Sequence, residues 1–251
     1  MNIYRFSNEN LKEYQQLYNF EGAKVLSVAG SGDQYFSSLL YGAENVELYD
    51  INKHAWYYFI LKFYAIKYLS YEMFFEYMIT NKMKDRSIYN ILKEKIICTS
   101  HEKDIINATN FFDRECVYKL LYKITTDIKR TIPYLEPEKY YQLQSILKDR
   151  ELPRFYLGDF FELVDELSQK NYDIILTSNI YNWAHFTYIK EDIDNYRETL
   201  FKFNCSEIQA LYSWKTLGKY EKLFEGFDID KIPSAYKLRE PADTVISLRQ
   251  K

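Results

Sequence analysis

Short apolar runs alternate with amphipathic stretches near the start of the chain. Residues 24–29 (KVLSVA) form a β-branched and aliphatic run of strand length, which stops at the glycine-containing turn 30–33. Residues 34–41 have a helical pattern, and residues 45–49 (NVELY) form a second strand candidate that ends at Asp50. Strand, turn, helix and strand in this order predict one βαβ unit.

The same alternation returns in the second half of the chain. Further apolar runs of strand length are separated by amphipathic helices, and two short strand candidates follow near the end. The expected strands are 154–157, 172–177, 207–213, 236–239 and 244–248, and the expected helices are 160–169 and 191–203. The sequence therefore predicts the α/β class, with a doubly wound, mostly parallel sheet of seven strands.

Strand patterns nearly vanish between these two regions. Residues 54–78 are dense in aromatic side chains and carry isolated charges, which is typical of a mostly buried helix. Further helices are expected at 86–97, 115–130 and 138–147, and another at 7–19 with Ser7 or Asn8 as its cap. We therefore predict a single domain over residues 1–251 with a helical insertion over 51–150.

Composition excludes several classes of protein. The 251 residues are 47% hydrophobic and 27% charged, which is typical of a globular chain and not of a disordered one. A net charge of -3 gives no general reason to bind nucleic acid, and no nucleic acid partner is expected. No apolar run is long enough for a transmembrane helix, so any membrane contact would be peripheral, and no signal peptide is expected. Three widely spaced cysteines then favour a cytoplasmic location.

The turn Ala29-Gly30-Ser31-Gly32 is the first candidate for chemistry. Glycines at the carboxyl end of a strand let the backbone approach a ligand, and Asp50 at the end of the next strand can accept hydrogen bonds from a ribose. A plain structural turn and a helix-capping Asp50 are the alternatives. A dinucleotide fingerprint would need a third glycine where Tyr35 stands, and no P-loop motif occurs. Together the two features predict an adenosine site.

Two later strand ends offer further candidates. Asp159 and Phe160 follow a strand and a glycine, so a carboxylate and a ring could hold an adenine, although an N-cap aspartate beside core phenylalanines explains them equally well. The segment 177–183 (TSNIYNW) follows another strand and faces the crevice expected in such sheets; an Asx turn is the alternative. His54, His101 and His185 stand apart, Cys98, Cys116 and Cys205 have no paired histidine, and no metal site is expected.

Four quoted segments together resemble a known family: VAGSGD, NVELYDIN, GDFF and DIILTSNIYNW. They are similar to S-adenosylmethionine-dependent transferases of the Rossmann-like methyltransferase fold. More narrowly, the stretch from Val25 to Tyr77, with its AENVELYDIN strand and Leu69-Ser70-Tyr71-Glu72, resembles the 3-amino-3-carboxypropyltransferases of betaine-lipid synthesis. A large helical insertion and an SNI-x-x-W segment at 178–183 are further shared features.

The resemblance implies S-adenosylmethionine as cofactor and a small-molecule or lipid acceptor. It implies that Gly30 and Gly32 border the methionine part, Asp50 the ribose, and Asp159 with Phe160 the adenine. The full expected cofactor set is Ala29, Gly30, Ser31, Gly32, Asp50, Ile51, Asp159, Phe160, Ser178 and Asn179. The expected catalytic set, chosen by position after the fourth strand, is Asn179, Tyr181 and Trp183. The insertion is expected to fold over the carboxyl edge of the sheet and shape an acceptor channel. A non-catalytic or NAD-type nucleotide-binding protein is the alternative.

Overall fold

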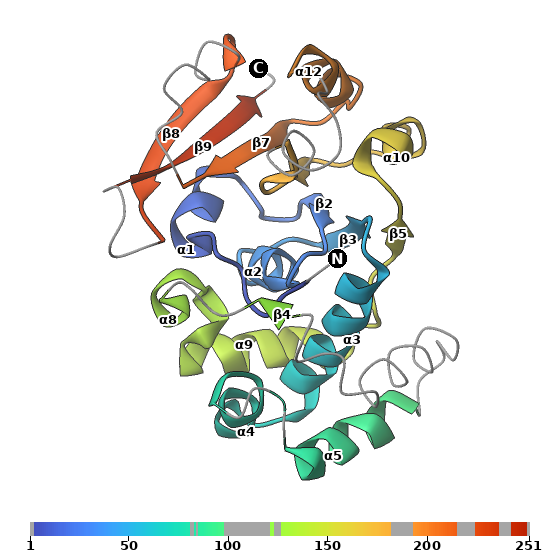
Figure 1. Ribbon diagram of the computed structural model, residues 1–251, viewed down its shortest axis with the longest axis vertical. Helices are drawn as coiled ribbons and strands as arrows, with labels where there is room; N and C mark the ends of the chain where they lie inside the picture. Colours follow the sequence, from blue (N-terminus) through green and yellow to red (C-terminus); the bar gives the residue numbers. More distant parts are fainter. Residues whose placement is uncertain are drawn as a thin grey trace.

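The computed structural model shows an α/β protein with helices on both faces of a central sheet (Figure 1). The structure describes residues 3–80, 83, 85–97, 121–122, 127–181, 193–214, 224–235 and 242–249. Within these residues, seven strands form the central sheet. They are β2 (Lys24–Val28), β3 (Asn45–Asp50), β5 (Phe155–Leu157), β6 (Ile174–Leu176), β7 (Glu207–Ser213), β8 (Asp228–Pro233) and β9 (Ala242–Arg249).

The order of the strands identifies the fold class. Across the sheet it is β5-β3-β2-β6-β7-β9-β8, and neighbours are parallel except at β9, which is antiparallel to β7 and β8. The chain therefore winds outward from β2 on one side and from β6 on the other, which makes the sheet doubly wound. An antiparallel strand inserted beside the last parallel one is the arrangement of the methyltransferase fold. The predicted fold class is confirmed.

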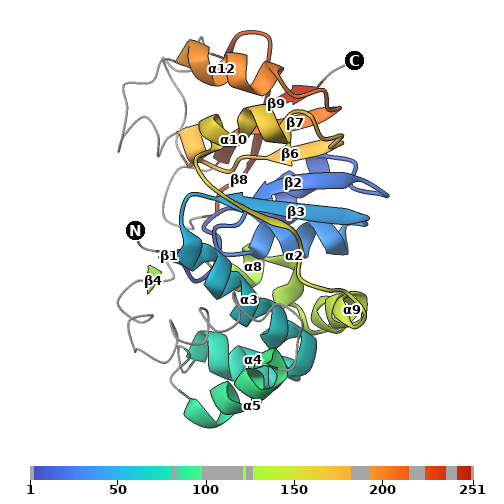
Figure 2. The same cartoon turned by 90° about the vertical axis from the view of Figure 1, so that its right-hand side faces the viewer.

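Alternate side chains of the inner strands explain why both faces are covered. Val25 and Ile174 belong to one core cluster, whereas their neighbours Leu26 and Ile175 belong to the other. Successive side chains of a strand point to opposite faces of the sheet. An inner strand of a parallel sheet therefore buries apolar side chains on both faces. The helices α2 (Asp33–Leu40) and α3 (Lys53–Tyr68) cover one face, and α10 (Phe160–Leu167) and α12 (Ile193–Phe201) cover the other (Figure 2).

A helical layer lies between β3 and β5 in the chain. The long helix α3 packs against α5 (Arg86–Ile97) and α9 (Pro137–Leu147), and α9 also contacts α2. The other described elements here are α4 (Tyr71–Phe75), a π-helical turn (Glu76–Thr80), β4 (Leu121–Tyr122), α8 (Ile128–Thr131) and a 3-10 turn (Pro133–Leu135). This layer therefore extends the α2 side of the molecule, away from α10 and α12 (Figure 2).

Two predicted helices are shorter in the structure than expected. The helix expected over 54–78 ends at Tyr68, and the Ser70 side chain then accepts a hydrogen bond of 3.2 Å from the Met73 backbone to begin α4. The helix expected over 7–19 is only α1 (Leu11–Tyr14), followed by a 3-10 turn (Gln15–Leu17). Neither Ser7 nor Asn8 is its cap; the cap position is Asn10.

Two further departures concern strands. The partner of β9 is β8 (Asp228–Pro233), whereas the expected strand 236–239 lies outside the described residues. The helix expected over 115–130 is described only in part, and there Leu121–Tyr122 pairs as a strand with β1 (Ile3–Tyr4). That two-stranded sheet was not predicted, because runs of two residues carry no periodicity.

No helix in the described part of the chain combines the length and apolar character needed to span a bilayer.

Candidate functional site

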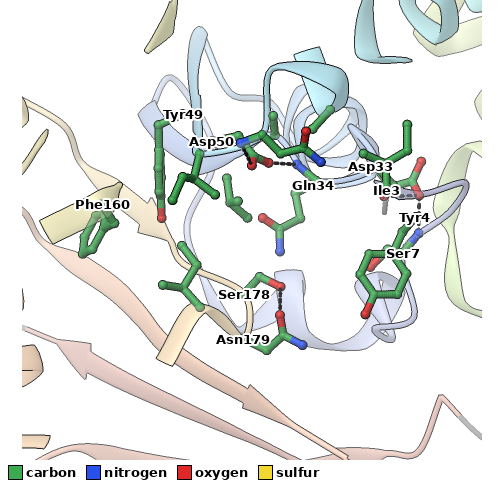
Figure 3. Close-up of a pocket in the computed structure, with 18 of the residues that line it drawn as sticks. Ile3, Tyr4, Ser7, Asp33, Gln34, Tyr49, Asp50, Phe160, Ser178 and Asn179 are labelled. Atoms are coloured by element: carbon green, nitrogen blue, oxygen red, sulfur yellow. Dashed lines mark hydrogen bonds between the residues drawn. The ribbon is translucent and has the colours of Figure 1, made fainter. Parts of the chain in front are cut away.

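A cavity of about 210 Å³ lies at the carboxyl ends of β2, β3, β5 and β6 (Figure 3). This is the switch point of the doubly wound sheet. Here β2 and β6 are neighbours, but the chain continues from β2 to β3 on one side of the sheet and from β6 to β7 on the other. The lining comes from the N-terminal segment, from the ends of the four strands with the turns that follow them, and from the first residues of α2, α3 and α10. The lining residues are Ile3, Tyr4, Ser7, Asn8, Val28, Ala29, Gly30, Ser31, Asp33, Gln34, Tyr49, Asp50, Ile51, Asn52, Ala55, Gly158, Asp159, Phe160, Phe161, Ser178, Asn179 and Ile180.

The two glycines of the first turn have different positions. Gly30 lines the cavity in a left-handed conformation (φ +49°), and a Cβ added there would meet nothing within 4 Å, so the absent side chain leaves room in the cavity. Gly32 (φ +82°) is not among the lining residues; it is the N-cap of α2, and a Cβ there would lie 2.9 Å from the Phe59 ring. Gly30 therefore shapes the cavity, and Gly32 allows α2 to pack closely on α3.

Asp50 lies directly beside this turn. Its carboxylate accepts a hydrogen bond of 2.9 Å from the Gly30 backbone N–H and one of 2.8 Å from that of Asn52. Burial raises the pKa of the Asp50 carboxyl to about 6, and these backbone hydrogen bonds limit the rise. A carboxylate has about four acceptor directions, so these contacts leave room for a hydrogen bond from a ligand hydroxyl.

At the third strand end, Asp159 is a helix cap that also lies in the cavity wall, and its contact with an adenine stays a prediction. The carboxylate caps α10 by accepting a hydrogen bond of 2.9 Å from the Phe161 backbone, and it also lines the cavity. Phe160 is buried at 3% exposure between Tyr49 and Phe203, with ring centroids 5.1 and 5.7 Å away. Its ring is therefore part of the core as well as of the cavity wall.

Ser178 follows β6 in a left-handed conformation (φ +58°), which is uncommon for a residue with a side chain. Its backbone N–H donates to the Gln209 side chain at 2.7 Å, and its carbonyl accepts from the Tyr212 backbone at 2.8 Å. These contacts hold the turn that places Asn179, 8% exposed, in the cavity wall.

The other two residues of the predicted catalytic set are placed differently. Tyr181 is not among the lining residues; it is buried, with its ring 5.2 Å from Tyr196 and 6.1 Å from Phe224. Trp183 lies outside the described residues. In the described part of the chain, the insertion contributes Ile51, Asn52 and Ala55 to the cavity wall, and the N-terminal segment lines it too. Much of the insertion that was expected to cover the carboxyl edge lies outside the described residues.

The N-terminal segment 3–9 is the part of the site that sequence patterns missed. The Ser7 backbone N–H donates to Asp33, which also accepts from Ser31 at 2.8 Å. Lys62, fully buried, donates to Asp33 at 2.8 Å and to the Arg5 carbonyl at 2.7 Å. Tyr134 donates to the same Asp33 carboxylate. This buried network fastens the segment to α2 and α3.

The Asp33 network had no local signal in the sequence. Ser7 lies 26 residues from Asp33 in the sequence and Tyr134 lies 101 residues from it, so no spacing or motif relates these residues. Burial lowers the pKa of the Lys62 ammonium to about 8, against the opposing effect of Asp33. In the sequence, Lys62 was visible only as one of several isolated charges in the aromatic stretch 54–78.

No protein-family model matches the sequence, and no curated protein matches it. Solved structures of similar fold include the rRNA methyltransferase aviRa from Streptomyces viridochromogenes (11% identity, 97% of this chain and 85% of that chain, TM-score 0.49). Others are the ribosomal protein L11 methylase from Lactobacillus delbrueckii subsp. bulgaricus (12%, 96% and 77%, 0.40) and a putative RNA methyltransferase from Pyrococcus horikoshii (11%, 96% and 81%, 0.40).

All three of these neighbours are named as methyltransferases or as a methylase. They contradict the expectation that no nucleic acid is involved, because two of the three are titled as RNA or rRNA methyltransferases. That exclusion used only the net charge of -3, which describes the whole chain and not one surface. None of the three titles names aminocarboxypropyl transfer.

Proposed function

We propose that the chain is an S-adenosylmethionine-dependent transferase. The observation that carries the proposal is the junction of the Gly30 turn with Asp50, 2.9 Å apart, at the switch point of a methyltransferase-type sheet. Ligands of doubly wound sheets bind outside the carboxyl ends of the strands at this point. The cavity here lies on the same four strand ends that the sequence singled out.

The residues present fit the chemical groups of this cofactor. Asp50 offers acceptor directions to a ribose diol, and the open space at Gly30 admits the chain that follows the ribose. At the other end, Asp159 and Phe160 offer a carboxylate acceptor and an aromatic wall for an adenine. Tyr35, which occupies the place of the third fingerprint glycine, is a buried core residue 4.9 Å from the Phe59 ring, and this disfavours the dinucleotide alternative.

The reaction type we propose is transfer of a methyl or a 3-amino-3-carboxypropyl group. The cofactor is a sulfonium with several electrophilic carbons, so the protein needs chiefly to align the acceptor with one of them. Asn179 lies in the cavity wall and could orient an acceptor through its amide. The resemblance to aminocarboxypropyltransferases supports the larger group, and the fold supports methyl transfer.

Calorimetry with S-adenosylmethionine and with NAD tests the binding half of this proposal. We expect saturable binding of the first and none of the second; the reverse preference, or no binding of either, would refute it. Chromatography of the turnover mixture tests the other half, with RNA among the acceptors supplied. Release of S-adenosylhomocysteine reports methyl transfer, and release of methylthioadenosine reports aminocarboxypropyl transfer.

A further inference from the structure

Glu9 is a buried carboxylate directly behind the cavity wall. Its side chain is 1% exposed, and it accepts a hydrogen bond of 2.9 Å from the Gln34 amide and another from the Ser178 hydroxyl. Gln34 and Ser178 both line the cavity (Figure 3). The Gln34 oxygen is already used, since it accepts from Ser27 at 2.8 Å, and this directs the amide nitrogen to Glu9.

These contacts place Glu9 behind the part of the wall that Gln34 and Ser178 form. Gln34 lies in the first turn of α2, which follows β2, and Ser178 lies in the turn after β6. The Glu9 carboxylate therefore bridges the segments that follow the two strands at the switch point. A charge on Glu9 is therefore one side chain away from any ligand in the crevice. In a water-poor interior, such a charge acts over several ångströms with little screening.

No cation partners this carboxylate within the described residues. The other buried acid at the site, Asp33, has Lys62 at 2.8 Å, but no lysine, arginine or histidine ion pair is present for Glu9 there. The groups that face Glu9 from other elements are Tyr14 of α1, Tyr212 of β7 and Asp243 of β9, none of which is cationic.

An unpaired buried carboxylate is unfavourable in the free protein. Burial raises the pKa of the Glu9 carboxyl to about 7, in spite of the hydrogen bonds from Ser178 and Gln34. A cation bound in the adjacent cavity would favour the charged form of Glu9 and would itself be stabilised. The natural partner for such a site is a ligand with a positive charge near the crevice.

We propose that Glu9 is a specificity-determining residue that acts as the counter-charge for a sulfonium ligand. Glu9 thereby favours the cationic cofactor over its neutral thioether products. This inference rests on the proposed function, since it assumes that the cavity holds S-adenosylmethionine. It assigns to the N-terminal segment a role in ligand choice in addition to covering the site.

The test compares two ligands that differ in charge at sulfur. Calorimetry at pH 8 measures the dissociation constants of S-adenosylmethionine and S-adenosylhomocysteine for the wild type, for Glu9→Gln and for Glu47→Gln. Glutamine keeps the shape of Glu9, and its amide can donate to the Ser178 oxygen. Glu47 is the matched control, because it accepts hydrogen bonds from Tyr156 and Tyr172 and does not line the cavity.

We expect Glu9→Gln to weaken S-adenosylmethionine binding about tenfold, the scale of one screened charge pair, and S-adenosylhomocysteine binding by less than about twofold. Glu47→Gln should leave the ratio of the two constants unchanged. Equal losses for both ligands would show that Glu9 only positions Gln34 and Ser178, and would overturn the counter-charge. Unchanged constants for both would overturn it as well. A wild type that binds neither ligand refutes the proposed function instead.

A pH series on the wild type gives a second readout that needs no variant. The preference for the sulfonium ligand should fall as the pH is lowered from about 8 to about 6, because protonation of Glu9 removes the charge. Asp50 titrates near the lower end of this range, but its predicted ribose contact is common to both ligands and cancels in the ratio. A ratio independent of pH would overturn the proposal.

Discussion

The two walls of the cavity are held by different kinds of interaction. On the strand-end wall, carboxylates accept hydrogen bonds from backbone groups of the same or the adjoining turn: Asp50 from Gly30 and Asn52, and Asp159 from Phe161. On the wall formed by residues 3–9, side chains reach elements far away in sequence. Glu9 and Ser178, for example, are 169 positions apart.

This difference predicts how each wall responds to substitution. Backbone donors stay in place when a side chain is replaced, so changes on the strand-end wall should affect ligands more than folding. The N-terminal wall depends on the buried ion pair of Lys62 with Asp33. Removal of one partner leaves the other as a buried charge without a counter-charge. Changes there should affect folding and the position of the segment.

Replacement of Lys62 by methionine should produce the largest effect. Asp33 would then be a buried carboxylate without its cation, and loss of one member of a buried pair costs about 3–5 kcal/mol of unfolding free energy. Chemical denaturation measures this loss. Hydrogen exchange should in addition show lower protection of the Ser7 amide, which donates to Asp33, than of amides in β2.

The control for Lys62→Met is Lys202→Met on the surface. Lys202 and Asp165 form an ion pair of 3.0 Å with side chains 50% and 82% exposed, and such pairs contribute about 0–1 kcal/mol. If the two methionine variants lost the same stability, the Asp33 network would not be what fastens the N-terminal wall.

The second largest effect should be a pH dependence of stability from Glu9. Its pKa in the folded protein, about 7, lies above the ordinary value of 4.5, so the folded state binds this proton more tightly than the unfolded state. The contribution is present below about pH 4.5 and is lost as the pH rises towards 7. Over this range the unfolding free energy of the wild type should fall by about 2–3 kcal/mol relative to Glu9→Gln.

Subtraction of the two proteins isolates Glu9 in that experiment. Asp50, with a pKa raised to about 6, adds a slope of the same sign to both proteins and cancels. Parallel curves of stability against pH would show that Glu9 does not titrate in this range, and the N-terminal wall would then hold no unpaired charge.

The same division explains how much the sequence could predict. Strand ends are marked locally by an apolar run that stops at glycine or aspartate, so Gly30, Asp50 and Asp159 were identified, and all three line the cavity. The doubly wound, mostly parallel sheet could be predicted because alternating strands and helices restrict the topology. Their roles toward a ligand stay predictions.

The N-terminal wall could not be predicted in the same way. Glu9 and Ser7 gain their partners only when β6, α2 and α3 come together, and this depends on tertiary packing and not on spacing. The local pattern even favoured a helix from Ser7 onward. In the structure the Ser7 amide donates to Asp33, the Asn10 amide donates to the Tyr212 hydroxyl at 2.9 Å, and α1 begins only at Leu11.

On the strand-end wall, Asp50→Ala should weaken S-adenosylmethionine binding by about 1.5–3 kcal/mol, the scale for hydrogen bonds to a charged group. Stability should not fall in parallel, because the substitution also removes a buried carboxylate whose charged form is unfavourable. Calorimetry and thermal unfolding measure the two quantities. An unchanged dissociation constant in a folded variant would remove Asp50 from the ligand site.

The smallest effect, and the sharpest separation of capping from binding, is expected at Asp159. Asparagine caps helices about as well as aspartate, so Asp159→Asn should keep the Phe161 hydrogen bond and the melting temperature. It should weaken the binding of adenosine ligands by about 1 kcal/mol. The binding of inosine ligands should be unchanged, because they lack the exocyclic amine that would donate a hydrogen bond to the carboxylate. Asp159→Ala should lose the cap as well, with about 1 kcal/mol less stability. Equal losses for adenosine and inosine ligands in Asp159→Asn would leave Asp159 a helix cap alone, and the adenine would then be recognised by other residues of the strand-end wall.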